Sequence, residues 1–327
     1  MTQPIPTGWT HPAHPPARTR LPSARVSALV QLQGLEVPAP RTRGSARLPI
    51  SALPGTSVYT VNGKLQGWST QWLVDTGAST SMVATPVVNA LGLQGQPIPN
   101  QRLSFAVAGN DCPNMDATLH QLPVLELEKV QVEGLRSLQF ANTVIPAKLS
   151  GVLGMDVLRQ FDLYLHPGKL TLSLLPPTLL PEDAIAAAIP LEQKLGVMVA
   201  QLHINDQGPF RVLLDTAADS TFISEQVATQ LKLDAATLSP IQIRGFCGLE
   251  NAMRSQLDTV TLHRYQRRNL DVVVLSSSIL KVLKVDGILG QNFLRHYQQY
   301  WRFNSGAKKG SLLLVPLATS PSASGGH

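Results

Sequence analysis

The chain has 327 residues, of which 43% are hydrophobic and only 15% are Asp, Glu, Lys or Arg. This length favours two domains, and the apolar content is high enough to bury sizeable cores. No apolar run approaches the ~18 residues that a membrane-spanning helix needs, which argues against an integral membrane protein. Two cysteines are too few for a disulfide scaffold or a cysteine-rich zinc site.

Most of the net charge of +6 lies at the N-terminal end of the chain. Residues 1–50 contain six arginines, no lysine and a single acid, Glu36, so their net charge is +5 of the total of +6. The rest of the chain is close to neutral and lacks the basic face that nucleic-acid binders use. We therefore expect no nucleic-acid partner.

Residues 1–44 hold eight of the 25 prolines and show no sustained hydrophobic period. This composition predicts a mostly disordered Pro/Arg-rich arm, either a solvated linker or a targeting or acid-binding stretch. No basic region followed by an apolar stretch is recognisable, so we predict no secretory signal; the compartment stays open, with the cytoplasm favoured. Residues 318–327 are expected to form a disordered Ser/Gly-rich tail.

Between these ends the sequence repeats itself. Residues 72–80 read WLVDTGAST and residues 212–220 read VLLDTAADS, at an offset of 140. Residues 151–158 (GVLGMDVL) match residues 287–294 (GILGQNFL) at an offset of 136. Landmarks that recur in the same order indicate a tandem duplication. The predicted organisation is an N-terminal lobe over 45–176, a linker over 177–190 and a C-terminal lobe over 191–317.

In chain order, each copy reads mostly as strands. Val58–Val61 is an apolar run followed by Asn62-Gly63, which predicts a hairpin turn. Val197–Ile204 is the corresponding run in the second copy and is followed by a turn over Asp206–Gly208. The predicted fold class is therefore all-β.

A short helix is expected after each repeated aspartate. Thr85 and Pro86 suit the N-cap and first position of the helix in the first copy, and Ser224 suits the N-cap of the helix in the second. Residues Glu182–Ala188 of the linker are expected to form one or two further helical turns. The fold class is thus all-β with short helices.

The repeated aspartates, Asp75 and Asp215, are the candidate catalytic residues. An aspartate at the end of an apolar strand is costly to place near a core unless something pairs with it. One in each copy suggests two carboxylates that face each other across an axis relating the copies. Two close carboxylates share one proton, so that one acts as base and the other as acid on a water molecule. The alternative is a pair of turn aspartates in a purely structural β-protein.

Other chemistries have no signature in the sequence. The eight histidines are scattered without metal-binding spacing. Phosphate-binding, dinucleotide-binding and serine-nucleophile motifs are absent from the sequence. We therefore predict neither a metal site nor a cofactor.

The segment Asp75–Ser79, followed by Gly151–Gly154, resembles the signature of retropepsin-like aspartic proteases. Asp215 with Gly287–Gly290 resembles the same lobe again, and the similarity covers about residues 45–317. The chain looks like a fused, single-chain version of the retropepsin homodimer. The resemblance implies two tandem acid-protease lobes related by a pseudo-twofold axis. It also implies an aspartic endopeptidase that cleaves polypeptides as a monomer.

The resemblance assigns a role to each matching residue. Asp75 and Asp215 would form the catalytic dyad, with Thr76 and Thr216 holding the two loops together. Gly77 and Ala217 would support the dyad, and Ser79 and Asp219 would bind the substrate main chain. Flaps that close over the substrate are expected at Phe105–Asn114 and Ile243–Asn251, with hairpin-tip glycines that contact the substrate at Gly109, Gly245 and Gly248.

The sequence also departs from the family pattern. Ala217 stands where a glycine is expected, and its methyl group could crowd the substrate or demand an unfavourable φ. The residue directly after Gly154 and Gly290 is not an arginine, whereas viral members have an arginine at that position. A catalytically weak homologue that binds peptides in the same cleft is therefore the alternative function. Cys112 and Cys247 fall in the two expected flaps, where they either form a disulfide that closes the cleft or stay unpaired.

Overall fold

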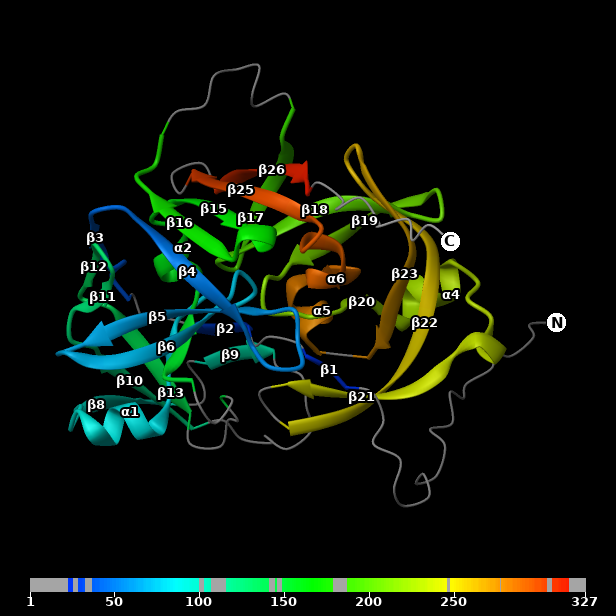
Figure 1. The fold of residues 1–327 in the computed structure, drawn as a ribbon. Coiled ribbons are helices and arrows are strands. Elements are labelled where there is room, and N and C mark those ends of the chain that lie inside the picture. Colours follow the sequence, from blue (N-terminus) through cyan, green and yellow to red (C-terminus); the bar gives the residue numbers. More distant parts are fainter. Residues whose placement is uncertain are drawn as a thin grey trace, which may run out of the picture.

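The computed structural model describes residues 23–25, 29–32, 37–99, 103–106, 116–140, 145, 149–178, 187–245, 248–276, 278–304 and 308–317. Strands dominate these residues and the helices are short, which confirms the predicted all-β class (Figure 1). The two copies of the repeat form two lobes that lie side by side. In the described part of the chain, no helix is long and apolar enough to cross a membrane.

The described residues of the first lobe form thirteen short strands and two helices. Its elements are β4 (Ala46–Ala52), β5 (Tyr59–Leu65), β6 (Trp68–Val74), β7 (Met82–Val83), α1 (Thr85–Ala90), β8 (Gly95–Ile98), β9 (Leu103–Ala106), β10 (Ala117–Gln121), β11 (Leu125–Leu127), β12 (Val130–Glu133), β13 (Arg136–Phe140), β14 (Gly151–Leu153), α2 (Met155–Leu158), β15 (Asp162–His166) and β16 (Thr171–Leu175), with a 3₁₀ turn at Pro167–Lys169.

The second lobe repeats this plan with longer strands after its first helix. Its elements are β17 (Ile189–Lys194), β18 (Val197–Ile204), β19 (Gln207–Leu214), β20 (Thr221–Ser224), α4 (Glu225–Gln230), β21 (Ser239–Gly245), β22 (Gly248–Leu262), β23 (Tyr265–Leu275), α5 (Ser278–Leu283), β24 (Gly287–Leu289), α6 (Gln291–Leu294), β25 (Tyr297–Asn304) and β26 (Lys309–Pro316), with a 3₁₀ turn at Ala235–Thr237.

The predicted turn at Asn62-Gly63 is wrong. Strand β5 runs straight through these residues, and the chain reverses at Gln66-Gly67, where both residues have positive φ. A Cβ at Gly63 would lie 2.9 Å from the carbonyl oxygen of Glu126, because β11 pairs with β5 at this point. The glycine therefore permits the close approach of a neighbouring strand and does not make a turn.

The other local predictions fare differently in the two copies. The hairpin of the second copy is confirmed, because β18 and β19 pair through a turn with positive φ at Asn205 and Asp206. Ser224 caps α4 as expected, accepting the Val227 N–H at 3.2 Å. Thr85 is instead the first residue of α1, and Ala84 occupies the N-cap without a side-chain bond. The expected helical turns at 182–188 lie largely outside the described residues.

Three strands lie within residues 1–44, the segment expected to be a disordered arm. They are β1 (Ser23–Arg25), β2 (Leu29–Leu32) and β3 (Arg41–Arg43). Each is held by a strand that is distant in sequence: β1 pairs with β21, β2 with β9 and β3 with β12. The amino-acid composition of residues 1–44 does not indicate these strand pairings, because the partner strands lie far along the chain.

A six-stranded section of the large sheet joins the lobes in the order β4, β16, β15, β25, β26, β17, with every neighbouring pair antiparallel. Its centre is the pairing of β15 with β25, where Tyr164 lies opposite Tyr300. Their rings stack with centroids 4.2 Å apart. Equivalent strands thus stand on either side of this pair, which places the pseudo-twofold axis between β15 and β25.

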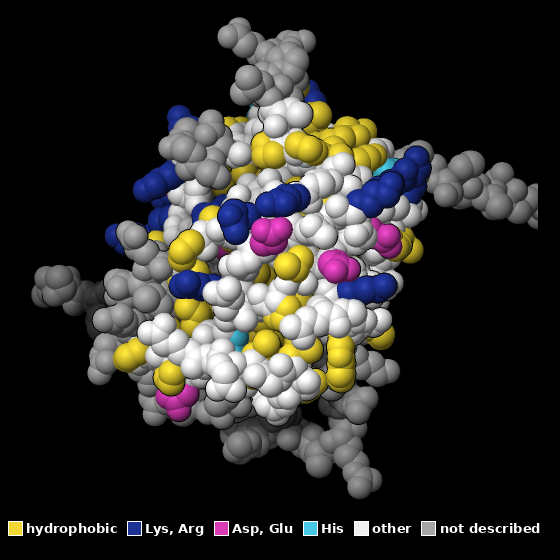
Figure 2. Space-filling view, turned by 90° about the vertical axis from the view of Figure 1, so that its left-hand side faces the viewer, with side chains coloured by type: hydrophobic (Ala, Val, Ile, Leu, Met, Phe, Trp, Pro, Cys, Tyr) yellow, Lys and Arg dark blue, Asp and Glu magenta, His cyan; other side chains and the backbone are white. Residues whose placement is uncertain are grey.

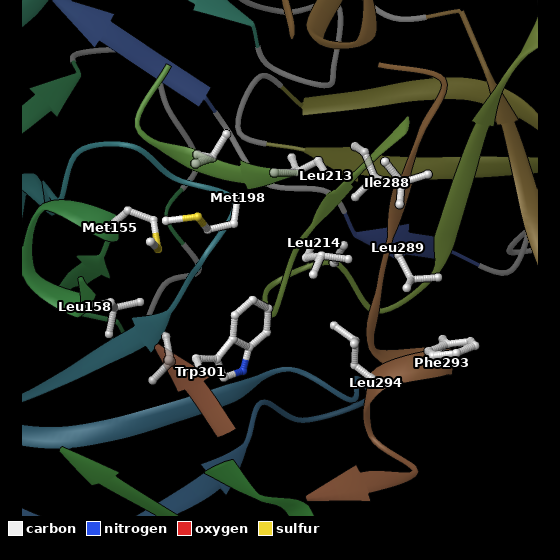
Figure 3. Packing of buried hydrophobic residues seen from close by; sticks show 14 of the residues in the cluster. Met155, Leu158, Met198, Leu213, Leu214, Ile288, Leu289, Phe293, Leu294 and Trp301 are labelled. Atoms are coloured by element: carbon white, nitrogen blue, oxygen red, sulfur yellow. The ribbon is translucent and has the colours of Figure 1, made fainter. Parts of the chain in front are cut away.

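The main hydrophobic core crosses the boundary between the lobes. Met155 and Leu158 of the first lobe belong to the same buried cluster as Met198, Leu214 and Trp301 of the second (Figure 3). Each of these side chains is almost completely removed from solvent. Because burial of this apolar surface requires both lobes, the core fixes their relative position.

The outer face of the first lobe carries basic side chains with acidic ones close by (Figure 2). On this lobe, Arg41 and Arg43 of β3 lie 3.7 and 3.8 Å from the Glu133 carboxylate of β12. Exposed pairs of this kind add little free energy each. They do give β3 a defined register on β12, which anchors the chain just before the first lobe begins.

Candidate active site

Asp75 and Asp215 are held in the same way at the ends of equivalent strands. Asp75 follows β6, which runs parallel to β14, and its N–H donates to the Leu153 carbonyl oxygen at 3.1 Å. Asp215 follows β19, which runs parallel to β24, and its N–H donates to the Leu289 carbonyl oxygen at 3.1 Å. The duplicated motifs that are far apart in sequence therefore meet directly in each lobe.

The glycine that ends each later motif is required by this packing. A Cβ at Gly154 would lie 2.9 Å from the Ala78 carbonyl oxygen, and one at Gly290 would lie 2.7 Å from the Ala218 carbonyl oxygen. Those carbonyls accept hydrogen bonds from the next residues, Met155 and Gln291. Glycine thus lets the chain pass close behind each aspartate loop and hold it in place.

Thr76 and Thr216 link the two loops reciprocally. The Thr76 N–H donates to Oγ1 of Thr216 at 3.0 Å, and the Thr216 N–H donates to Oγ1 of Thr76 at 3.1 Å. Each hydroxyl then donates across the interface, Thr76 to the Leu214 carbonyl oxygen and Thr216 to the Val74 carbonyl oxygen. These four hydrogen bonds are buried and lock the aspartate loops together across the axis.

Both carboxylates are oriented by their own loops. Oδ1 of Asp75 accepts the N–H groups of Gly77 and Ala78 at 2.8 and 2.9 Å. Oδ1 of Asp215 accepts the N–H groups of Ala217 and Ala218 at 2.8 and 3.0 Å. One oxygen of each carboxylate is therefore fixed by two backbone donors in the same way in both lobes.

Gly77 brings the first loop directly against the carboxylate of the second. A Cβ at Gly77 would lie 2.6 Å from Cγ of Asp215. The Asp215 carboxyl group thus stacks on the backbone of the loop that carries Asp75. Both aspartates have 0% exposed surface, so the pair is enclosed.

Ala217 fits its loop without backbone strain. Its φ is not positive, so the expected penalty for replacing glycine does not arise. The side chain is buried in a small cluster with first-lobe residues that include Ala78 and Met82. The Ala217 methyl group therefore packs among apolar residues, whereas a methyl group at the equivalent residue, Gly77, would clash with the Asp215 carboxylate.

The remaining site residues predicted from sequence lie beside these loops, at the end of the β21–β22 hairpin or outside the described residues. Ser79 and Asp219 are partly buried at equivalent positions, and Ser79 packs against Gly196 in the turn between β17 and β18. Gly245 and Gly248 are the last paired residues of the β21–β22 hairpin, in the segment expected to be a flap. Gly109, Cys112 and Cys247 lie outside the described residues.

A polar bridge behind the first loop was not predicted. Ser81 donates from its N–H and its hydroxyl to the two carboxylate oxygens of Asp156, at 3.0 and 2.6 Å. Its hydroxyl also accepts the Gly154 N–H. Burial raises the pKa of the Asp156 carboxyl, an effect that these hydrogen bonds only partly offset. In the second lobe the equivalent contact joins Thr221 to Asn292 and is uncharged.

Alignment of the two copies could have drawn attention to these residues. Asp156 and Asn292 occupy the same position of the repeated motif, as do Met155 and Gln291. Gln291 is fully buried, and its Nε2 donates to the Thr216 carbonyl oxygen at 2.9 Å. Polar residues at duplicated positions can thus be found from the sequence, although their hydrogen-bond partners cannot.

Among the described residues, no cluster of His, Cys, Asp and Glu could hold a metal ion.

Comparison with known proteins agrees with this geometry. A sequence model of the gag-polyprotein putative aspartyl protease family matches residues 61–160 and again residues 200–296. The chain belongs to this family. It is a retropepsin-like protein with two repeats, and each matched region contains one of the two aspartate loops. No curated protein matches the chain in sequence.

Among solved structures, a retropepsin-like aspartic protease from Rickettsia conorii matches part of the chain. The match has 16% sequence identity and a TM-score of 0.30, and it covers 40% of this chain and 93% of that protein.

Proposed function

We propose that the protein is an aspartic endopeptidase whose catalytic dyad is Asp75 and Asp215. The observation that carries the proposal is the stacking of the Asp215 carboxylate on the Gly77 backbone, within a pair of loops locked by Thr76 and Thr216. Two carboxylates oriented this way across an axis are suited to share one proton, as in the paired aspartates of known acid proteases.

The proposed reaction uses one aspartate as base and the other as acid. The ionised carboxylate takes a proton from water while the water oxygen attacks the peptide carbonyl carbon. The protonated partner gives its proton to the carbonyl oxygen. Collapse of the tetrahedral intermediate then breaks the C–N bond as a proton passes to the leaving nitrogen. Because Oδ1 of each aspartate is fixed by two loop amides, Oδ2 of each is the oxygen that exchanges protons.

Substrate binding falls to groups around the dyad. We propose that Ser79 and Asp219 contact the substrate main chain from the loops, and that Gly245 and Gly248, with Gly109, contact it from the flaps. Extended peptides commonly bind by adding a strand to an exposed sheet edge, which suits flap hairpins. A polypeptide is thus the proposed substrate.

Digestion of an unbiased peptide library tests this function. Wild type is expected to cleave internal peptide bonds, whereas Asp75→Asn and Asp215→Asn are expected to be inactive. Specific activity should stay constant over a hundredfold dilution, because one chain supplies both aspartates. Absence of cleavage by wild type at every pH between 3 and 7 would contradict the proposal.

The second candidate function is a peptide-binding module with little catalysis. It is favoured by Ala217, which replaces a glycine that the family is expected to have. Binding of peptides by wild type, without cleavage, supports this candidate over the first. Cleavage that is lost in both asparagine variants rules it out.

A further inference from the structure

We propose that β1 and β2 of the N-terminal arm (Ser23–Arg25 and Leu29–Leu32) occupy the peptide-binding site of the protein's own flaps and exclude other peptides from it. This inference deepens the proposed function, on which it rests, by naming a regulator of the same site. The observation behind it is the pairing of β1 with β21 and of β2 with β9. Figure 1 shows β1 beside β21 and β2 beside β9.

The two pairings place the arm on both flap regions. β21 is the first strand of the hairpin that ends at Gly245 and Gly248, and its outer edge is covered by β1. β9 precedes the expected tip of the first flap, and its described partner is β2. A peptide that adds a strand to either edge must first displace the arm.

The direction of the arm matches what a pseudo-twofold site requires. Strands related by a twofold axis run in opposite directions, so a single extended peptide lies parallel to one and antiparallel to the other. β1 is parallel to β21 and β2 is antiparallel to β9. β1 and β2 therefore have the two directions that one extended peptide would have on the two flaps.

The register brings the near ends of β1 and β2 to the ends of β21 and β9 that lead into the expected flap tips. Arg25 pairs with Arg244, next to the hairpin end at Gly245, and Leu29 pairs with Ala106, the last residue of β9. Only three residues separate Arg25 from Leu29, so their Cα atoms lie within about 14 Å of each other. β1 thus runs toward the end of β21 at Gly245, and β2 runs away from the end of β9 at Ala106.

Two further observations agree with an occupied site. Asp75 and Asp215 have no exposed surface, although a dyad that acts on polypeptides must be reached by substrate and water. Val37, beyond β2 in the chain, packs against the hydrophobic cluster that includes Ala78 and Ala217. β3 then fixes the arm to β12 of the first lobe.

Because the arm is covalently attached to the protein, even weak binding of its strands is sufficient to fill the site. Residues 33–40 join β2 to β3, and a linker this short gives an effective concentration in the millimolar range. An arm with a dissociation constant of ~100 μM in free form would then fill the site about ten times more often than it leaves it empty. Apparent affinity for any competing peptide falls by the same factor of about ten.

The test uses full-length chains with prolines in the two arm strands. Successive N–H groups of a strand point to opposite sides, so replacing two neighbours removes the one that faces the partner strand. The strand-breaking variant carries Ala24→Pro, Arg25→Pro, Val30→Pro and Gln31→Pro. The control variant carries four prolines earlier in the arm: Thr2→Pro, Gln3→Pro, Thr7→Pro and Gly8→Pro.

The first readout is independent of catalysis. A fluorescein-labelled synthetic peptide with the sequence of residues 21–34 is titrated into each protein in an Asp75→Asn background. We expect roughly tenfold tighter binding to the strand-breaking variant than to wild type or the control variant. Equal binding to all three proteins would overturn the inference.

The second readout is hydrolysis by the same proteins with Asp75 intact. We expect kcat/KM for library peptides to rise about tenfold in the strand-breaking variant only. If no protein cleaves while the binding difference remains, the proposed function fails and the arm inference stands. If all proteins cleave equally well, the arm inference fails and the proposed function stands.

A cleavable arm guards against misfolding of the proline variant. A recognition site for a sequence-specific protease, inserted between Gly34 and Leu35, lets the folded chain be cut after purification. Cutting followed by removal of the released fragment should reproduce the tighter peptide binding. Unchanged binding after complete removal of the fragment would contradict the proposal.

Discussion

The first-lobe loop carries glycine at residue 77, and the second-lobe loop carries alanine at the equivalent residue 217. Both residues donate their N–H to Oδ1 of their own aspartate at 2.8 Å, so the backbones are alike. They differ in what lies beyond the α-carbon. Gly77 faces the Asp215 carboxylate, whereas the Ala217 methyl group packs among apolar residues. The duplication has therefore kept the hydrogen bonds of the loop and let the side-chain packing diverge.

The largest effect should be the same in both lobes. We expect Asp75→Asn and Asp215→Asn each to lower kcat by at least ~10³, because acid and base are then no longer matched. The pH–rate profile of wild type should be bell-shaped, with limbs that belong to the pair and not to either residue. Full activity in Asp215→Asn would mean that the second lobe takes no part in catalysis.

The threonine link should also be symmetric. Thr76→Val keeps the shape of the side chain but leaves the Thr216 N–H and the Leu214 carbonyl without their buried partner. We expect a loss of about 3 kcal/mol in the free energy of unfolding, measured by urea denaturation. Thr216→Val should cost a similar amount. A loss in only one variant would show that the two lobes contribute unequally to the interface.

Substitutions at residues 77 and 217 should have different effects on catalysis in the two lobes. Gly77→Ala places a methyl group 2.6 Å from Cγ of Asp215, so the dyad must shift. A shift of the dyad by about 1 Å is expected to lower kcat/KM about 10²-fold. Ala217→Gly removes a methyl group that packs among buried apolar residues, so we expect kcat/KM to change much less than in Gly77→Ala. A clear rise in kcat/KM would show that the methyl group hinders catalysis, as the weak-homologue candidate requires.

Much of this organisation is readable from sequence, because the duplication repeats short motifs in order. The two aspartate loops and the glycines behind them were predicted, since each motif is local. The three strands within residues 1–44 were not, because their partners lie far along the chain and their composition resembles that of a linker. The turn expected at Asn62-Gly63 is wrong because glycine also occurs where a neighbouring strand approaches the backbone closely, as β11 does here.

The smallest predicted effect concerns Asp156, whose equivalent in the second lobe is Asn292. Burial raises the pKa of the Asp156 carboxyl, so the folded state binds its proton more tightly than the unfolded state does. The stability from this group is fully present below its unfolded pKa of about 3.9 and is lost as pH rises through the folded pKa. Asp156→Asn should remove this component, although it also loses the bond from the Ser81 N–H at every pH.

The measurement is the free energy of unfolding of both proteins between pH 3 and 8. The wild-type value minus the Asp156→Asn value should fall as pH rises, whatever the constant offset between them. Asn292→Asp is the matched control, because its carboxylate would face the Asp271 carbonyl oxygen that Asn292 now donates to. That variant should acquire a loss of stability with rising pH in the second lobe. A difference that stays flat with pH in both variants would mean that neither position holds a carboxyl group with a raised pKa.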